Sequence, residues 1–178
     1  MNRRSFLKWL HWLSAALILY FFLVEPEDDA QGALAKADAL STHAGMGVLL
    51  ALVTALWLGL YVRKGLAGRP GPKLPAWGKR FHELSHKVLQ IGVPVMVASG
   101  AFAGLAAPFA IRAFDWFQIT PGIGGKGLHN FAEEVHEIVF NGLLIVIVAH
   151  IIFHVGRHFL LKDNALRIMA PRVLHKYL

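Results

Sequence analysis

Apolar residues gather into four long runs along the chain instead of alternating with polar residues. The runs cover residues 9–24, 44–62, 88–111 and 138–153, and none contains Lys, Arg, Asp or Glu. About 20 apolar residues in a helix cross roughly 30 Å of hydrocarbon, and each run reaches that length with its flanks. Lipid offers the backbone no hydrogen bonds, so each run must be helical. The pattern predicts transmembrane helices at about 8–24, 43–62, 83–107 and 132–161.

The composition supports the same class. The chain is 56% hydrophobic and only 16% charged, whereas a soluble domain has about 25% charged residues. We expect an all-α fold, an integral membrane four-helix bundle, as a single domain over residues 1–178. The Pro- and Gly-rich stretch at 68–75 predicts a stiff linker, and the stretch at 119–127 predicts a loop that does not bind phosphate.

Basic residues gather beside the chain ends and the link between helices two and three, which places both termini in the cytoplasm. The net charge of +7 follows from this bias, so no nucleic-acid partner is needed. The "RRSFLK" stretch at 3–8 looks like an export signal, but we expect it to be retained because His11 lies inside the run that follows. The residues predicted inside are Arg3, Arg4, Lys8, Arg63, Lys64, Arg69, Lys73, Lys79, Arg80, Arg157, Lys162, Arg167, Arg172 and Lys176.

Histidine is the residue type most suited to chemistry here. The chain has ten histidines and no cysteine, which excludes covalently attached haem, iron–sulfur clusters and thiolate chemistry. Four of the histidines lie in or beside the fourth apolar run, where an imidazole without a partner costs several kcal/mol. Histidine in a bundle interior is a suitable ligand for haem iron. These four are His136, His150, His154 and His158.

Spacing along the fourth helix selects a pair. His136 and His150 are about 21 Å apart along the axis and about 40° apart around it. His154 and His158 lie near the same face, so angle alone does not choose among them. Measured from His136, they are about 27 and 33 Å away.

Depth then matches this helix to the first two. His11 begins helix one at the inner end, and His43 begins helix two at the outer end, so the two differ in depth by roughly 20 Å. His136 with His150 fits that depth best. We therefore expect two haems, with His43 and His136 as the outer pair of iron ligands and His11 and His150 as the inner pair. Gly45 and Gly47, close after His43, would let a flat macrocycle approach the helix.

Two alternatives stay open. A single histidine in the membrane often forms a hydrogen bond between helices. A metal-transport site is also conceivable, since His150, His154 and His158 are spaced i, i+4, i+8. Such a site normally recruits carboxylates, and the apolar runs contain none, so we favour haem.

Short motifs at matching places resemble one known family. They are "LHW" at 10–12, "HAG" at 43–45, "HE" at 136–137 with His150 following, and "RHFLLKDNALRIMAP" at 157–171. Over nearly its whole length the chain resembles the prokaryotic cytochrome b561 family of di-haem four-helix membrane cytochromes. The resemblance implies the same two pairs, His11 with His150 and His43 with His136. Which of His82 and His86 corresponds to the family's histidine on helix three stays open.

The resemblance also implies a function. It predicts a multi-pass protein of the bacterial inner membrane with two haem b groups, which moves electrons between a periplasmic one-electron donor and ubiquinone on the cytoplasmic side. One branch of the family acts as a superoxide:ubiquinone oxidoreductase, and we favour that activity. The alternatives are an electron-transfer or membrane-anchor subunit that connects the quinone pool to a protein partner, and a non-redox histidine-rich membrane protein.

Donors at the inner end suit the quinone. His82, His86, His158 and Lys162 are predicted to meet there beside apolar surface, and imidazole transfers protons near neutral pH.

The outer end carries more acidic than basic residues, which on average repels an anion such as superoxide. Arg112 and Lys126 are the candidates for a local basic spot that guides it. Superoxide or a periplasmic redox protein, ubiquinone and the lipid bilayer are thus the expected partners.

Overall fold

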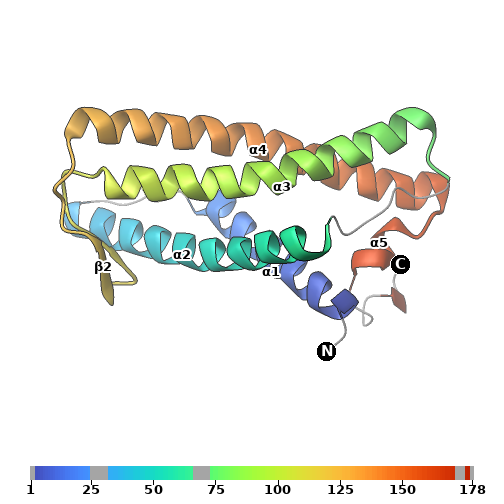
Figure 1. Cartoon of the computed structure of the whole chain (residues 1–178), viewed down its shortest axis with the longest axis horizontal. Helices are drawn as coiled ribbons and strands as arrows, with labels where there is room; N and C mark the ends of the chain where they lie inside the picture. The colour runs from blue at the N-terminus through green and yellow to red at the C-terminus, as the bar shows by residue number, and fades with distance from the viewer. Residues whose placement is uncertain (1–2, 25–31, 66–72, 171–174, 177–178) are drawn as a thin grey trace.

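The computed structural model describes residues 3–24, 32–65, 73–170 and 175–176. Four long helices, α1 to α4, are each long and apolar enough to cross a membrane, which confirms the predicted membrane bundle (Figure 1). Among the described residues there are also a short helix and a two-stranded antiparallel hairpin. The elements are α1 (Arg3–Leu23), α2 (Ala33–Lys64), α3 (Ala76–Leu105), β1 (Ile111–Ala113), β2 (Phe117–Thr120), α4 (Lys126–Leu161) and α5 (Ala165–Met169).

All four long helices begin earlier than the apolar pattern indicated. α2 begins at Ala33 rather than near 43, and α4 at Lys126 rather than near 132. The added turns contain good helix formers such as Ala, Leu and Lys, which continue a helix beyond the hydrocarbon. Most of the predicted linker at 68–75 lies outside the described residues. The hairpin was not predicted, because strands of three and four residues carry too short a pattern to recognise.

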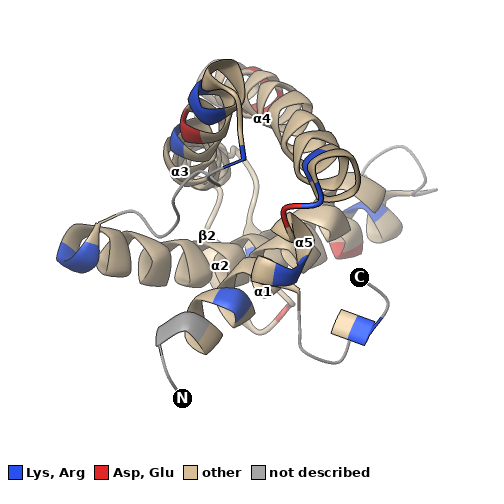
Figure 2. Ribbon diagram, turned by 90° about the vertical axis from the view of Figure 1, so that its right-hand side faces the viewer, with Lys and Arg blue, Asp and Glu red and all other residues tan. Residues whose placement is uncertain are grey.

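Figure 1 shows α3 and α4 side by side, with α1 and α2 forming the other part of the bundle. Both termini and α5 lie at one end, which we call the terminal end. The hairpin lies at the other, which we call the hairpin end. Figure 2 views the molecule from the terminal end, where many of the blue Lys and Arg segments gather. The described basic residues at the ends of the elements there include Lys8, Arg63, Lys64, Lys73, Lys79, Arg80, Arg157, Lys162 and Arg167.

An apolar layer fills the middle of the bundle. Leu17 of α1, Leu50 and Val53 of α2, Met96 of α3 and Leu143 of α4 are all buried and pack together. Leu143 stands halfway between His136 and His150 in the sequence. This layer therefore separates the histidines of the hairpin end from those of the terminal end. Large apolar side chains on the outside of the helices are exposed, as lipid-facing residues must be.

The hairpin is fixed onto α2. Phe114 and Asp115 at its tip have φ angles of 51° and 59°, in the left-handed region that non-glycine residues rarely adopt. The Phe114 N–H donates to the Ser41 carbonyl at 3.1 Å, and the Asp115 N–H donates to Ser41 Oγ at 2.8 Å. The Phe114 ring lies so close to Gly45 that a Cβ there would be 2.5 Å from it. At Gly45 the close approach is thus made by Phe114, and our interpretation of this glycine as space for a macrocycle was wrong. A Cβ at Gly47 would meet nothing within 4 Å, so the same interpretation of Gly47 stays a prediction.

Contacts between the two chain ends hold the terminal end together. The Trp12 indole donates to the Met169 carbonyl at 2.8 Å, which attaches α1 to the end of α5. Arg157 Nε donates to Asp163 Oδ2 at 2.6 Å, and both side chains are almost fully buried. Asp163 also accepts the Ala165 N–H at 3.0 Å, so this carboxylate positions the turn that leads from α4 into α5.

Candidate functional site

The hairpin end brings together two of the predicted ligands. The rings of His43 on α2 and His136 on α4 have centroids 6.4 Å apart. Two imidazoles that bind opposite sides of one iron have centroids about 6 Å apart, if each metal–nitrogen bond is about 2 Å. The observed separation therefore suits a shared axial pair.

A hydrogen-bond chain fixes the proton on His136. Ser99 Oγ donates to the Met96 carbonyl at 2.9 Å and lies 3.0 Å from His136 Nδ1. A serine hydroxyl has one proton to donate, and the Met96 carbonyl takes it. His136 Nδ1 must then donate its own proton to Ser99. This leaves a lone pair on Nε2, which is how ligating histidines are usually held by a neighbour that is not itself a ligand.

Gly100 has no side chain and so leaves room for the His136 ring. A Cβ at Gly100 would lie 2.8 Å from His136 Cε1 and 3.2 Å from Nδ1. The imidazole therefore lies directly on the backbone of α3, and a small residue between packed membrane helices is what permits such an approach.

Among the described residues, His43 forms no hydrogen bond between helices. Its Nδ1 is buried and has no hydrogen-bond partner among the described residues. Its other close neighbour is the Phe21 ring, with centroids 4.9 Å apart. A buried polar atom without a partner is costly, and iron coordination through the same ring would compensate for that cost. The residues at the hairpin end thus fit haem.

The predicted inner pair is arranged differently. His150 Nδ1 is also buried without a partner among the described residues, but its ring contacts are to His154 and His86, at 4.4 and 4.9 Å between centroids. His11 interacts electrostatically with both His86 and His150. Within the described part of the chain, no direct ring contact joins His11 to His150. The imidazole nitrogens at this end are of the type that binds haem iron, and His11 and His150 lie at the same end as predicted.

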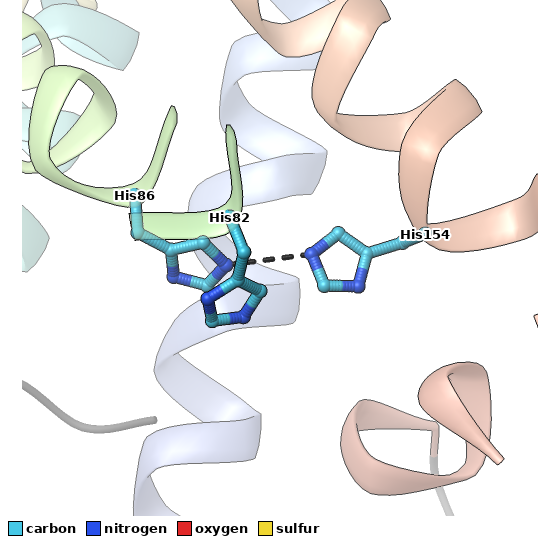
Figure 3. Close-up of side chains that lie close together, drawn as sticks. All are labelled: His82, His86 and His154. Carbon is cyan, nitrogen blue, oxygen red and sulfur yellow. Dashed lines mark hydrogen bonds between the residues drawn. The ribbon is translucent and has the colours of Figure 1, made fainter. Parts of the chain in front are cut away.

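A group of three histidines joins α3 to α4 at the terminal end (Figure 3). Each of His82, His86 and His154 offers one nitrogen, and these nitrogens all lie within 4.8 Å of one another. The Nε2 atoms of His86 and His154 are 3.4 Å apart. The sequence suggested a possible metal group along α4 alone, through His150, His154 and His158. The structure instead joins His154 to the i, i+4 pair on α3.

The four residues predicted for the quinone do not form one contact cluster. His82 and His86 stack with centroids 4.2 Å apart. His158 is buried, with an unpartnered Nδ1, and in the described structure it has no ring contact with either of them. Lys162 is exposed at the end of α4, with a left-handed φ of 48°.

The two basic residues predicted to guide an anion, Arg112 and Lys126, differ in how freely their charge faces the surroundings. Arg112 Nε and Nη2 donate to the Asp115 carbonyl at 3.1 and 2.7 Å, so its guanidinium holds the hairpin tip. Lys126 is exposed where α4 begins. Among the two, Lys126 is therefore the better candidate for long-range guidance.

Sequence reasoning missed another buried histidine. His129 is held by the Ala103 carbonyl at 3.0 Å from Nδ1 and by Glu133 Oε1 at 3.1 Å from Nε2. Nδ1 links α4 to the end of α3, and Nε2 pairs with Glu133 of the same helix, so His129 serves the fold.

Comparison with protein families gives one match across almost the whole chain. The family described as prokaryotic cytochrome b561 matches residues 2–172. Comparison with curated proteins finds no match.

Proposed function

We propose that this chain, which belongs to the prokaryotic cytochrome b561 family, holds two b-type haems and carries electrons from a periplasmic donor to ubiquinone. Membership of the family makes it a multi-pass membrane protein of haem b electron transfer, and four spanning helices agree with that. The number of haems, their ligands, the two substrates and the bacterial inner membrane as its location are our proposals.

The observation that carries the proposal is the His43–His136 pair. The two ring centroids are 6.4 Å apart, the Ser99 bond leaves a lone pair on His136 Nε2, and His43 Nδ1 is buried without a partner in the described structure. These features suit two histidines that would hold one iron between them. His11 and His150 are proposed for the second haem, about 21 Å away along α4. Bound haem would supply a reversible one-electron couple, and ligation by two histidines would disfavour dioxygen binding at the iron.

The proposed reaction balances without any further reactant. Two superoxide ions lose one electron each and become two dioxygen molecules. One ubiquinone gains the two electrons and two protons and becomes ubiquinol. Oxidation of superoxide releases no protons, so all protons must be supplied at the quinone.

His158 and Lys162 are the residues proposed to act at the quinone. The buried, unpartnered His158 nitrogen can form a hydrogen bond with a quinone carbonyl and pass on a proton. A fixed positive charge on Lys162, exposed nearby in the sequence, would stabilise negative charge on a half-reduced quinone. Whichever of His82 and His86 is free of other ligands would contribute a further donor.

A protein donor is the second candidate at the outer face. Trp116 and Ile123 at the hairpin end are 85% and 86% exposed, and aromatic residues are enriched where proteins dock. Arg112, in contrast, is already bonded to the hairpin. These features support the alternative of an electron-transfer or anchor subunit that joins a protein partner to the quinone pool.

Haem content is the first test. Purified protein should contain two b haems per chain, and both should be released by acid because no cysteine tethers them. His43→Ala or His136→Ala should remove one haem. His129→Gln, a buried histidine at the same end, should keep both. A chain with no haem, or with one, would contradict the scheme.

Rapid kinetics separate the two donors. Superoxide added under anaerobic conditions should reduce the protein, and a short-chain ubiquinone should then reoxidise it. Reduction by superoxide no faster than in a His43→Ala variant would favour the protein-partner alternative.

A further inference from the structure

We propose that His82 and His86 of α3 and His154 of α4 form a binding site for one divalent transition-metal ion at the terminal end of the bundle. None of the three is among the four residues proposed as haem ligands, although the His150 ring contacts His86 and His154, with centroids 4.9 and 4.4 Å apart. The proposal does not depend on the electron donor, on the quinone or on the direction of electron flow.

The backbone already presents the three rings to one point. Residues i and i+4 lie on the same face of a helix, and two histidines at that spacing are a common way to bind zinc. His154 faces them from the neighbouring helix (Figure 3). Two nitrogens on one tetrahedral ion, each about 2.0–2.1 Å from it, are about 3.4 Å apart. The Nε2 atoms of His86 and His154 are 3.4 Å apart, and the nitrogens of all three lie within 4.8 Å of one another.

Hydrogen bonding alone satisfies the group poorly. The His86–His154 contact can use one proton and one lone pair. His82 Nδ1 remains buried with no partner in the described structure, and His82 itself is only 6% exposed. A buried polar nitrogen without a partner costs free energy. An ion would accept one lone pair from each of the three rings and would leave a fourth position for water.

The donor set points to the class of ion. Imidazole nitrogens suit zinc, copper and nickel, whereas magnesium and calcium require oxygen ligands. Charged groups around the histidines are few. Arg157 interacts with all three, but its charge is paired with Asp163. Glu83, the neighbour of His82, supplies negative charge from the exposed side.

Occupation of this site has a consequence for the quinone. His82 and His86 cannot bind an ion and donate to a carbonyl through the same nitrogens. With the ion bound, the proposed quinone donors are His158 and Lys162 alone.

Metal binding to the haem-loaded protein tests the proposal. The protein is purified without a histidine tag, treated with a chelator, and equilibrated with Zn²⁺ in the presence of excess Mg²⁺. Elemental analysis should then find one zinc per chain. His82→Ala, His86→Ala and His154→Ala should each weaken zinc binding by about 100-fold or more. His129→Gln, at a buried histidine near the other end of the same helix, should bind zinc as the unaltered protein does.

X-ray absorption at the zinc edge tests the site in the unaltered protein, so it does not depend on whether a variant folds. The unaltered protein should show three imidazole nitrogens at about 2.0 Å from the zinc. Less than one zinc per chain in the unaltered protein, fewer than three imidazoles, or zinc that survives in the His82→Ala/His154→Ala double variant would overturn the proposal.

Discussion

Replacing Gly100 by alanine should disturb the hairpin-end haem through one methyl group. The added Cβ would lie 2.8 Å from His136 Cε1, 3.2 Å from Nδ1 and 3.3 Å from Nε2. Ordinary contact begins at 3.4 Å, so the ring must move by roughly half an ångström to escape a contact within a packed helix pair. His136 cannot make that movement freely, because Ser99 holds its Nδ1 at 3.0 Å.

Overpacking of this kind costs about 1–3 kcal/mol, and 1.4 kcal/mol is tenfold in an equilibrium constant. We therefore expect Gly100→Ala to weaken haem binding at His136 by about 10- to 100-fold. The matched control is Gly104→Ala, one turn along the same helix, where a Cβ would meet nothing within 4 Å. Both substitutions gain the same helix propensity, about 0.5–1 kcal/mol, so that gain cancels in the comparison.

The assay is haem per chain after graded dilution in detergent, together with the low-spin electron paramagnetic resonance signals. Gly100→Ala should lose one haem at lower dilution, or shift one signal, while Gly104→Ala matches the unaltered protein. Identical haem retention and spectra in the two variants would refute the placement of His136 as an iron ligand against the backbone of α3.

Three further predictions concern the terminal end. Asp163→Asn should lower the free energy of unfolding by about 3–5 kcal/mol, because it leaves the buried Arg157 charge unpaired. Thermal unfolding measures this loss. The control Glu137→Gln, at an exposed residue, should change the free energy of unfolding little. A reporter fused to the C-terminus should read as cytoplasmic, and a periplasmic reading would invert the inner and outer ends proposed here. His158→Ala should slow reoxidation by ubiquinone by about 100-fold in stopped-flow measurements while both haems stay reducible; if it matches His175→Ala, the quinone binds elsewhere.

The sequence predicted the four helices well because their signal is local. Each run satisfies its own hydrogen bonds and needs only enough apolar length to cross the bilayer. The starts of α2 and α4 were placed too late, since polar helix beyond the hydrocarbon leaves no mark in hydropathy. The hairpin was not predicted, because its position depends on contacts with Ser41, which lies far away in the chain.

Some contacts between histidines were likewise predictable from the sequence, and others were not. Depth along two helices indicated that His43 and His136 would meet, because the distance along a helix follows from residue number alone. The group around His154 was not predicted, since it depends on the register between α3 and α4. The i, i+4 spacing of His82 and His86 was visible in the sequence, but their partner on the other helix was not.

The apolar layer in the middle of the bundle constrains how the proposed reaction can run. Leu17, Leu50, Val53, Met96 and Leu143 close the space between the two ends. Electrons can pass between two haems across such a layer, but protons require polar groups or water and are excluded from it. Ubiquinone reduced at the terminal end must therefore take its two protons from water on that side. With the termini in the cytoplasm, each turnover would move two negative charges inward and consume two cytoplasmic protons. On this proposal, the separation of the two ends by apolar side chains makes the reaction contribute to the membrane potential instead of dissipating it.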